Sequence, residues 1–130
     1  MSKLLKLSLV MVFFCVGLFV YAYAADVLRP TGYEAVAVDN NVGGRGFTEA
    51  KYWDSTNNRI KSDYAVIINE TAPIRFTVDG TAPTSTVGAL LVPSQAWVFE
   101  TYEEVKAFRA IRTGDVSASL KVLFYKRFKQ

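Results

Sequence analysis

The polar residues best placed to bind a ligand lie at Asp79, Thr81 and Thr84, within the segment IRFTVDGTAPTSTVG (74–88). One carboxylate and two hydroxyls would suit a sugar or a cation, but calcium prefers about six to eight oxygen ligands. The same residues are typical of a chain that leaves a sheet, because glycine takes a positive φ without steric cost and Pro83 cannot donate to a ladder. We therefore favour a bend, and keep Asp79 and Thr81 as candidate ligand-binding residues.

Other reactive arrangements are incomplete in this sequence. The chain has no histidine, which is the commonest general base and a frequent zinc ligand. Glu103 and Glu104 are neighbours and do not share a face, whereas glycosidase chemistry requires two carboxyls held across one bond. The GGRG segment (43–46) lacks the following helix and the Lys-Ser/Thr pair of a phosphate loop. The sequence thus predicts no catalytic residue, no metal site and no cofactor.

Exposed aromatic side chains are the remaining route to a binding site. Tryptophan and tyrosine are enriched in interfaces, and their rings stack well on apolar faces such as those of sugars. Trp53 and Trp97 are each more consistent with the core, while Tyr102, beside two glutamates, is expected at the surface. Trp97 and Tyr102 complete the set of candidate ligand-binding residues.

The N-terminal segment has the composition of an export leader. Lys3 and Lys6 precede the apolar run LSLVMVFFCVGLFV (7–20), and small residues follow at Ala22 and Ala24, where a signal peptidase would cleave. A retained membrane anchor is the alternative, because a helix over residues 7–25 would rise about 28 Å, close to the apolar thickness of a bilayer. We predict a cleaved signal peptide at 1–24 and an exported protein, located in the periplasm, at the cell surface or outside the cell.

The predicted mature chain, residues 25–130, is expected to form one domain with a single core. Its only cysteine, Cys15, falls in the leader, so disulfides are excluded within the domain. Large aromatic side chains would supply the core, each contributing about 1.5–3 kcal/mol when fully buried. These are Tyr33, Phe47, Trp53, Phe76, Trp97, Phe99, Phe108 and Phe124.

The charge of the chain does not indicate a nucleic-acid partner. Without Lys3 and Lys6, 13 basic side chains face 12 acidic ones. The basic residues nevertheless gather in the last 25 positions, where seven of them face only Asp115. We interpret them as charges that protect an exposed terminal strand from pairing, with a basic face toward an acidic surface as the alternative.

Short runs with strand character alternate with turn signals along the mature chain. Tyr64–Ile68 is continuously apolar, which predicts burial on both faces. Val116–Lys126 alternates, and places Val116, Ala118, Leu120, Val122 and Phe124 on one side. One short helical turn is expected at Thr101–Ala107. The other expected strands are Tyr33–Val38, Phe47–Trp53, Ile74–Asp79, Ala89–Val92, Trp97–Glu100 and Phe108–Arg112.

About seven strands at spacings near ten residues predict an all-β fold, a single antiparallel β-sandwich of immunoglobulin-like or jelly-roll-like type. Two alternatives stay open for residues 26–60. They form a strand pair of the sandwich, or an arm that adds a strand to the sheet edge of a neighbouring subunit.

The order IRFTVDGTAPTSTVG, KAFRAIRTG, SASLKVLFY resembles a pattern in small β-sandwich proteins encoded among the structural genes of tailed bacteriophages and prophages. Residues 77–84 (TVDGTAPT) are also similar to a turn in the immunoglobulin-like domains of chitobiases and other secreted glycosidases. The first resemblance implies a structural protein that decorates a larger assembly. The second implies a carbohydrate-binding accessory module.

These observations favour a secreted, non-enzymatic structural or interaction protein that works by presenting a β-sandwich surface. Its expected partners are another protein surface or its own subunits, with a glycan as the alternative. Nucleic acid is not expected, and contact with a membrane is expected only through an uncleaved leader. A small hydrolase is disfavoured because no acid-base pair is visible.

Overall fold

The computed structural model describes residues 26–129, and one unit, Leu28–Arg127, holds the core. The signal peptide predicted at 1–24 lies outside the described residues. Strands make up most of the regular secondary structure of the described chain, and two short helices interrupt them. The elements are β1 (Val27–Val38), α2 (Glu49–Tyr52), β2 (Trp53–Asp54), β3 (Arg59–Ile60), β4 (Tyr64–Asn69), β5 (Ile74–Thr77), β6 (Ala89–Leu91), β7 (Ala96–Phe99), α3 (Tyr102–Ala107), β8 (Arg109–Arg112) and β9 (Ala118–Phe128).

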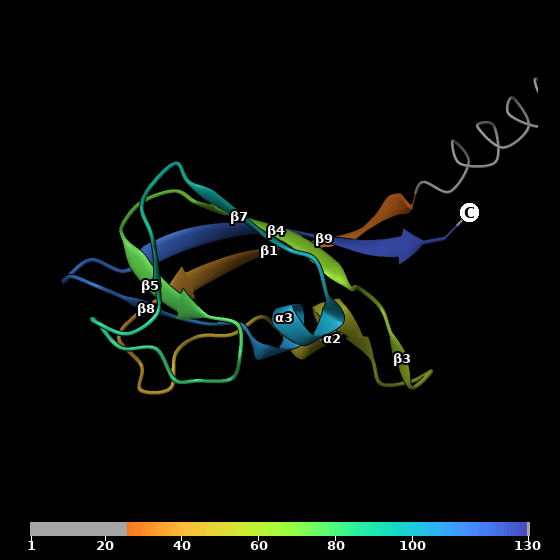
Figure 1. Ribbon diagram of the computed structural model, residues 1–130, viewed down its shortest axis with the longest axis horizontal. Helices are drawn as coiled ribbons and strands as arrows, with labels where there is room; N and C mark the ends of the chain where they lie inside the picture. Colours follow the sequence, from red (N-terminus) through yellow and green to blue (C-terminus); the bar gives the residue numbers. More distant parts are fainter. Residues whose placement is uncertain (1–25, 130) are drawn as a thin grey trace, which may run out of the picture. The chain divides into compact units, whose positions relative to one another are not determined.

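The strands form two principal sheets and a small hairpin. The larger sheet has the order β1-β9-β4-β7 and the smaller one the order β6-β5-β8, while β2 and β3 pair with each other. The strands of the smaller sheet lie beneath the larger one in Figure 1, and α2 and α3 lie beside them. The prediction of an all-β chain built from antiparallel sheets packed on each other is confirmed.

The strand pairs are nested in the sequence. β5 pairs with β6, and β4, which precedes β5, pairs with β7, which follows β6. One step further out, Arg45 pairs with Ala110 of β8, and β1 pairs with β9. The chain therefore resembles one long hairpin, with its tip at β5 and β6, wrapped into two layers.

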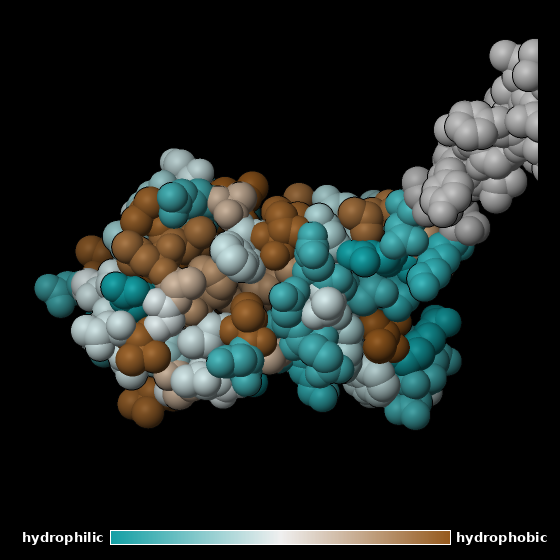
Figure 2. All heavy atoms as spheres, in the orientation of Figure 1, coloured by the Kyte–Doolittle hydropathy of each residue, from teal (hydrophilic) through white to brown (hydrophobic). Residues whose placement is uncertain are grey.

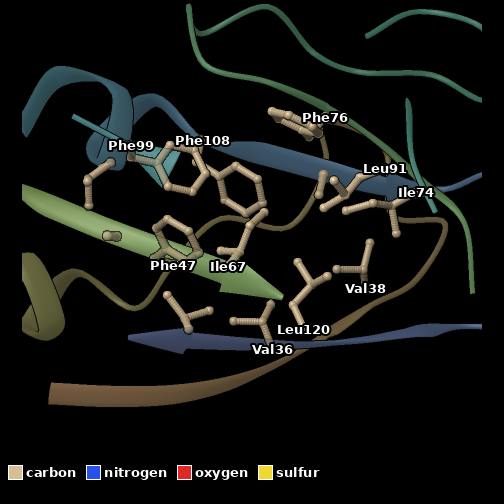
Figure 3. Close-up of a cluster of buried hydrophobic side chains, with 14 of the residues drawn as sticks. Val36, Val38, Phe47, Ile67, Ile74, Phe76, Leu91, Phe99, Phe108 and Leu120 are labelled. Carbon is tan, nitrogen blue, oxygen red and sulfur yellow. The ribbon is translucent and has the colours of Figure 1, made fainter. Parts of the chain in front are cut away.

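The core lies between the two sheets and follows from alternation along each strand. In β9, Ala118, Leu120, Val122 and Phe124 are buried, as their spacing predicts, whereas Val116 precedes the strand and is exposed. Figure 3 shows side chains of the two sheets pointing toward one another. The labelled residues include Val36, Ile67 and Leu120 from the larger sheet and Ile74, Phe76 and Leu91 from the smaller one.

Phe47 closes the core between the sheets, although it belongs to no strand. Its ring stacks on Phe108 with centroids 4.3 Å apart, and meets Phe99 and Phe124 edge-on. The strand expected at Phe47–Trp53 is wrong, because the chain forms the single helical turn α2 after Phe47. Glu49, Ala50 and Lys51 favour helix and are uncommon in strands, so the local sequence itself supports the turn.

Two other predictions about burial are wrong. Tyr64–Ile68 is buried on one face only, since Ala65 and Ile67 lie in the core while Ile68 is exposed. Tyr33 and Trp97 were expected in the core, but they are 50% and 43% exposed. Tyr33 faces away from the core, because Val36 and Val38 of the same strand are the buried ones.

The N-terminal part of the domain folds back on its own sheet. β1 pairs with β9 of the same chain, so the alternative of an arm that reaches a neighbouring subunit is wrong. β9 in turn lies between β1 and β4 and is not an edge strand. The basic residues of β9 (Lys121, Lys126 and Arg127) therefore do not protect a free edge, whereas Arg109 and Arg112 lie in β8, at the edge of the smaller sheet. Two of them form ion pairs, Lys126 with Asp63 at 2.9 Å and Lys121 with Glu70 at 3.6 Å.

Candidate functional site

Asp79 and Thr81 lie in a bend that follows β5. The Thr81 amide donates to the Asp79 carboxylate at 2.9 Å, and this bond is the main cause that lowers the pKa of Asp79. The Thr77 hydroxyl donates to the Thr81 carbonyl at 2.5 Å, and Gly80 has a φ of 85°. The turn thus engages the Asp79 carboxylate and the backbone of Thr81, as expected of a bend.

Trp97 lies in β7, at the edge of the larger sheet. Its ring meets the buried Phe76 ring edge-on, with centroids 5.2 Å apart, and 43% of the residue is exposed. Leu90 of the neighbouring edge strand β6 is 50% exposed. Figure 2 shows apolar residues gathered on the surface over β5 and β7, while hydrophilic residues dominate over α2 and α3.

Tyr102 belongs to a different part of the molecule. It begins α3 and packs against Tyr52 and Trp53, with centroids 6.1 Å and 6.2 Å away. The Lys106 ammonium lies 5.9 Å from its ring centroid. Of the four candidate residues, only Asp79 and Thr81 contact each other, so the four do not form one binding site.

Within residues 26–129, no cluster of three His, Cys, Asp or Glu side chains could hold a metal ion. The same residues contain no helix that is long and apolar enough to cross a membrane.

A different surface stands out on the larger sheet, on the side away from the core. We call it the outer face. It is formed by the residues of β1, β9, β4 and β7 that alternate with the buried ones. They are Tyr33, Ala35 and Ala37 of β1, Lys121, Leu123 and Tyr125 of β9, Tyr64, Val66 and Ile68 of β4, and Ala96 and Val98 of β7.

The register of the strands aligns apolar side chains into a row across the outer face. Val66 is paired with Leu123 of β9 on one side and with Val98 of β7 on the other. Ile68 lies beside this row, paired with Ala96. Leu123, Val98 and Ile68 are 41%, 40% and 42% exposed. The exposed side of an antiparallel sheet is normally polar, so an apolar row at this place is a departure from the usual pattern.

The one charged residue of the outer face, Lys121, has an acidic neighbour. Lys121 Nζ lies 3.6 Å from Glu70 Oε2. A hydrogen bond with Tyr33, followed by attraction to Glu70, raises the pKa of Lys121 above its ordinary value. At the other end of the face, Tyr64 and Tyr125 meet edge-on at 5.9 Å, and the Arg127 guanidinium lies 5.7 Å from the Tyr64 ring.

The sequence contains one signal for this face, the apolar run at Tyr64–Ile68. A strand covered on both sides and a strand with one exposed apolar side have the same sequence pattern. Only the partners of β4 in the sheet, together with the absence of a covering element over the described part of the chain, distinguish the two cases.

No protein-family model matches the chain, and a search of curated proteins finds no significant match.

Proposed function

We propose that this chain is an exported, non-enzymatic structural protein that associates with a second copy of itself through the outer face of its larger sheet. The apolar row Leu123, Val66 and Val98 is the observation that carries the proposal. Two such sheets can pack face to face at about 10 Å with their side chains interdigitated.

The charge pattern favours a second copy as the occupant. Lys121 is already paired with Glu70 and Tyr33, so contact between two outer faces places no unpaired charge against a like one. A strongly charged partner would find no complementary group there. Two-fold symmetric pairs are also the commonest homo-oligomers, because one self-compatible patch is enough to build them.

The strand order supports a jelly-roll-like sandwich in preference to an immunoglobulin-like one. Nested pairs from β5·β6 out to β1·β9, shared between two sheets, are what a double Greek key produces. Capsid and lectin domains use this architecture, so the fold is compatible with the phage-like resemblance carried by the segments IRFTVDGTAPTSTVG, KAFRAIRTG and SASLKVLFY. Because one fold serves many functions, we base the proposal on the outer face and not on the fold.

Carbohydrate binding, the other function considered, has weaker support. Trp97 is half exposed, but its only aromatic neighbour among the described residues is the buried Phe76. The Asp79 carboxylate accepts from the Thr81 amide within its own turn, and the Thr81 carbonyl accepts from the Thr77 hydroxyl. Neither feature presents a second stacking ring or a free polar group beside Trp97.

Sedimentation velocity tests the proposal on residues 25–130, from about 1 μM to about 1 mM. We expect a reversible dimer whose population rises with concentration. Ile68→Lys or Leu123→Lys should raise the dissociation constant at least about tenfold, because each places an unpaired ammonium in an apolar contact.

Val116→Lys is the matched control, since Val116 is 67% exposed and lies in the loop before β9. It should leave the dissociation constant unchanged. A chain that remains monomeric over the whole concentration range would contradict the proposal, and so would an equal effect of Val116→Lys and Ile68→Lys.

A further inference from the structure

The GGRG segment, which has no phosphate-loop character, borders a hollow on the side of the smaller sheet. The hollow has a volume of about 400 Å³ and is lined by Gly44, Arg45, Gly46, Phe47, Thr48, Tyr52 and Arg109. Ligand pockets commonly have about 300–1,000 Å³ and are lined by aromatic residues with a few polar groups. The hollow falls in this size range, but its lining is mainly polar, with Phe47 and Tyr52 as its two aromatic residues. It lies apart from the outer face.

The backbone of the segment is fixed against β8. The Arg45 amide donates to the Ala110 carbonyl at 2.7 Å, and the Ala110 amide donates back to the Arg45 carbonyl at 2.9 Å. The wall of the hollow that carries Arg45 is therefore held by the sheet.

The two glycines that flank Arg45 make room for the side chain of Arg109. A Cβ atom on Gly46 would lie 2.5 Å from Arg109 Nη1, and one on Gly44 would lie 3.1 Å from Arg109 Cβ. Arg109 Nη1 donates to the carbonyls of Phe108, at 2.6 Å, and Lys106, at 3.3 Å. These contacts hold the guanidinium against the backbone at the end of α3.

Neither guanidinium meets a carboxylate within residues 26–129. Arg45 makes no side-chain hydrogen bond or ion pair with a described residue, and Arg109 bonds only to carbonyls. The nearby Glu34 carboxylate is engaged by the Thr48 amide at 3.2 Å and by the Thr48 hydroxyl. An arginine has five donors arranged as a planar fork, so both side chains keep donors for a ligand.

Tyr52 adds a third donor. The residue is 9% exposed and lines the hollow. Burial is the main cause that raises the pKa of Tyr52, and Glu49 raises it further, whereas Arg109 opposes this effect. The hydroxyl thus stays protonated at neutral pH and can donate a hydrogen bond.

The geometry points to a binding site for a small carboxylate, held by the guanidinium groups of Arg45 and Arg109 with the Tyr52 hydroxyl as a further donor. The planar fork matches a carboxylate, and the nearly buried rings of Phe47 and Tyr52 leave a small apolar contact beside it. Glu34 and Glu49 near the hollow disfavour a doubly charged phosphate. A singly charged aromatic or aliphatic carboxylate fits best.

Benzoate is a suitable probe, and benzamide is its neutral counterpart of nearly the same shape. We titrate each into residues 25–130 at constant ionic strength, and follow the amide and arginine Nε–H resonances by NMR. Benzoate should cause saturable shifts at Arg45, Gly46 and Arg109, and benzamide should cause none. Inorganic phosphate should bind more weakly than benzoate.

Arg45→Gln should raise the dissociation constant for benzoate by about tenfold or more, because it removes a charge-assisted hydrogen bond to the carboxylate. The exposed Arg45 can be replaced without loss of core packing. Arg59→Gln is the matched control, since Arg59 is an exposed arginine that pairs with Asp54 on the β2-β3 hairpin.

Three results would overturn the inference. These are equal binding of benzoate and benzamide, equal effects of Arg45→Gln and Arg59→Gln, or no saturation below about 50 mM benzoate. The association of two copies through the outer face does not involve this hollow, so either proposal can fail without the other.

Discussion

Individual glycines show how much a single position can decide in this fold. Gly88 has a φ of 113°, and a Cβ atom there would lie 2.7 Å from the Phe76 carbonyl oxygen of β5. Gly80 has a φ of 85° with open space around it, and Gly114 has neither a positive φ nor a close neighbour. Substitutions at these three positions therefore distinguish the cost of a positive φ, present at Gly80 and Gly88, from the cost of a steric overlap, present only at Gly88.

Alanine at these three positions should give graded losses of stability. Gly114→Ala should be nearly neutral, and Gly80→Ala should lower the free energy of unfolding by about 1–2 kcal/mol through its positive φ. Gly88→Ala should cost more than Gly80→Ala, because the new methyl group also displaces the backbone of β5. Urea unfolding followed by tryptophan fluorescence measures all three. Equal losses at Gly80 and Gly88 would show that the overlap with Phe76 is relieved at no cost.

Among the secondary-structure elements, the short helix α3 contributes to the stability of the core although it has only six residues. Thr101 and Glu104 form a capping box, in which the Glu104 amide donates to Thr101 Oγ1 at 3.2 Å and the Glu104 carboxylate accepts from the Thr101 amide. α3 buries Val105 fully and leads directly to Phe108 at the centre of the aromatic core. The cap thus fixes where the chain enters β8.

Thr101→Ala should lower the free energy of unfolding by about 1 kcal/mol, since it removes the acceptor for the Glu104 amide. Glu103→Ala is the matched control in the same helix, because Glu103 is exposed and outside the capping box. Its effect should stay within about 0.5 kcal/mol. Chemical denaturation of the two variants decides, and a loss for Glu103→Ala as large as for Thr101→Ala would refute a specific role of the cap.

For secondary-structure elements, the sequence predicts strands well where one face is buried and the other is polar. β9 and β5 alternate clearly, so their positions and their inward residues are predictable. The exposed apolar side of β4 cannot be predicted in this way, because the local sequence pattern does not reveal which elements cover a strand. The hollow is less predictable still, since the need for glycine at Gly46 comes from Arg109, and the need at Gly44 comes from a positive φ together with Pro83 and Arg109, which the fold brings beside it.

For the molecule as a whole, the nested strand pairs predict slow folding. β1 pairs with β9 and Arg45 with Ala110, so most pairing joins segments far apart in the sequence. Loop closure must then be completed before these contacts stabilise the chain. We expect refolding from urea in about milliseconds to seconds, measured by stopped-flow tryptophan fluorescence. Complete recovery within about 100 μs would be incompatible with this topology.

The pairing of β1 with β9 has a consequence for a chain that is threaded through a translocation channel from its N-terminus. β1 is the first strand to leave the channel, and it can pair with β9 only after β9, the last strand, has also crossed. Until then its apolar residues Val36 and Val38 stay uncovered. Such a chain would therefore depend on holding chaperones until release, and a nascent chain stalled before residue 118 would be an early target for proteases.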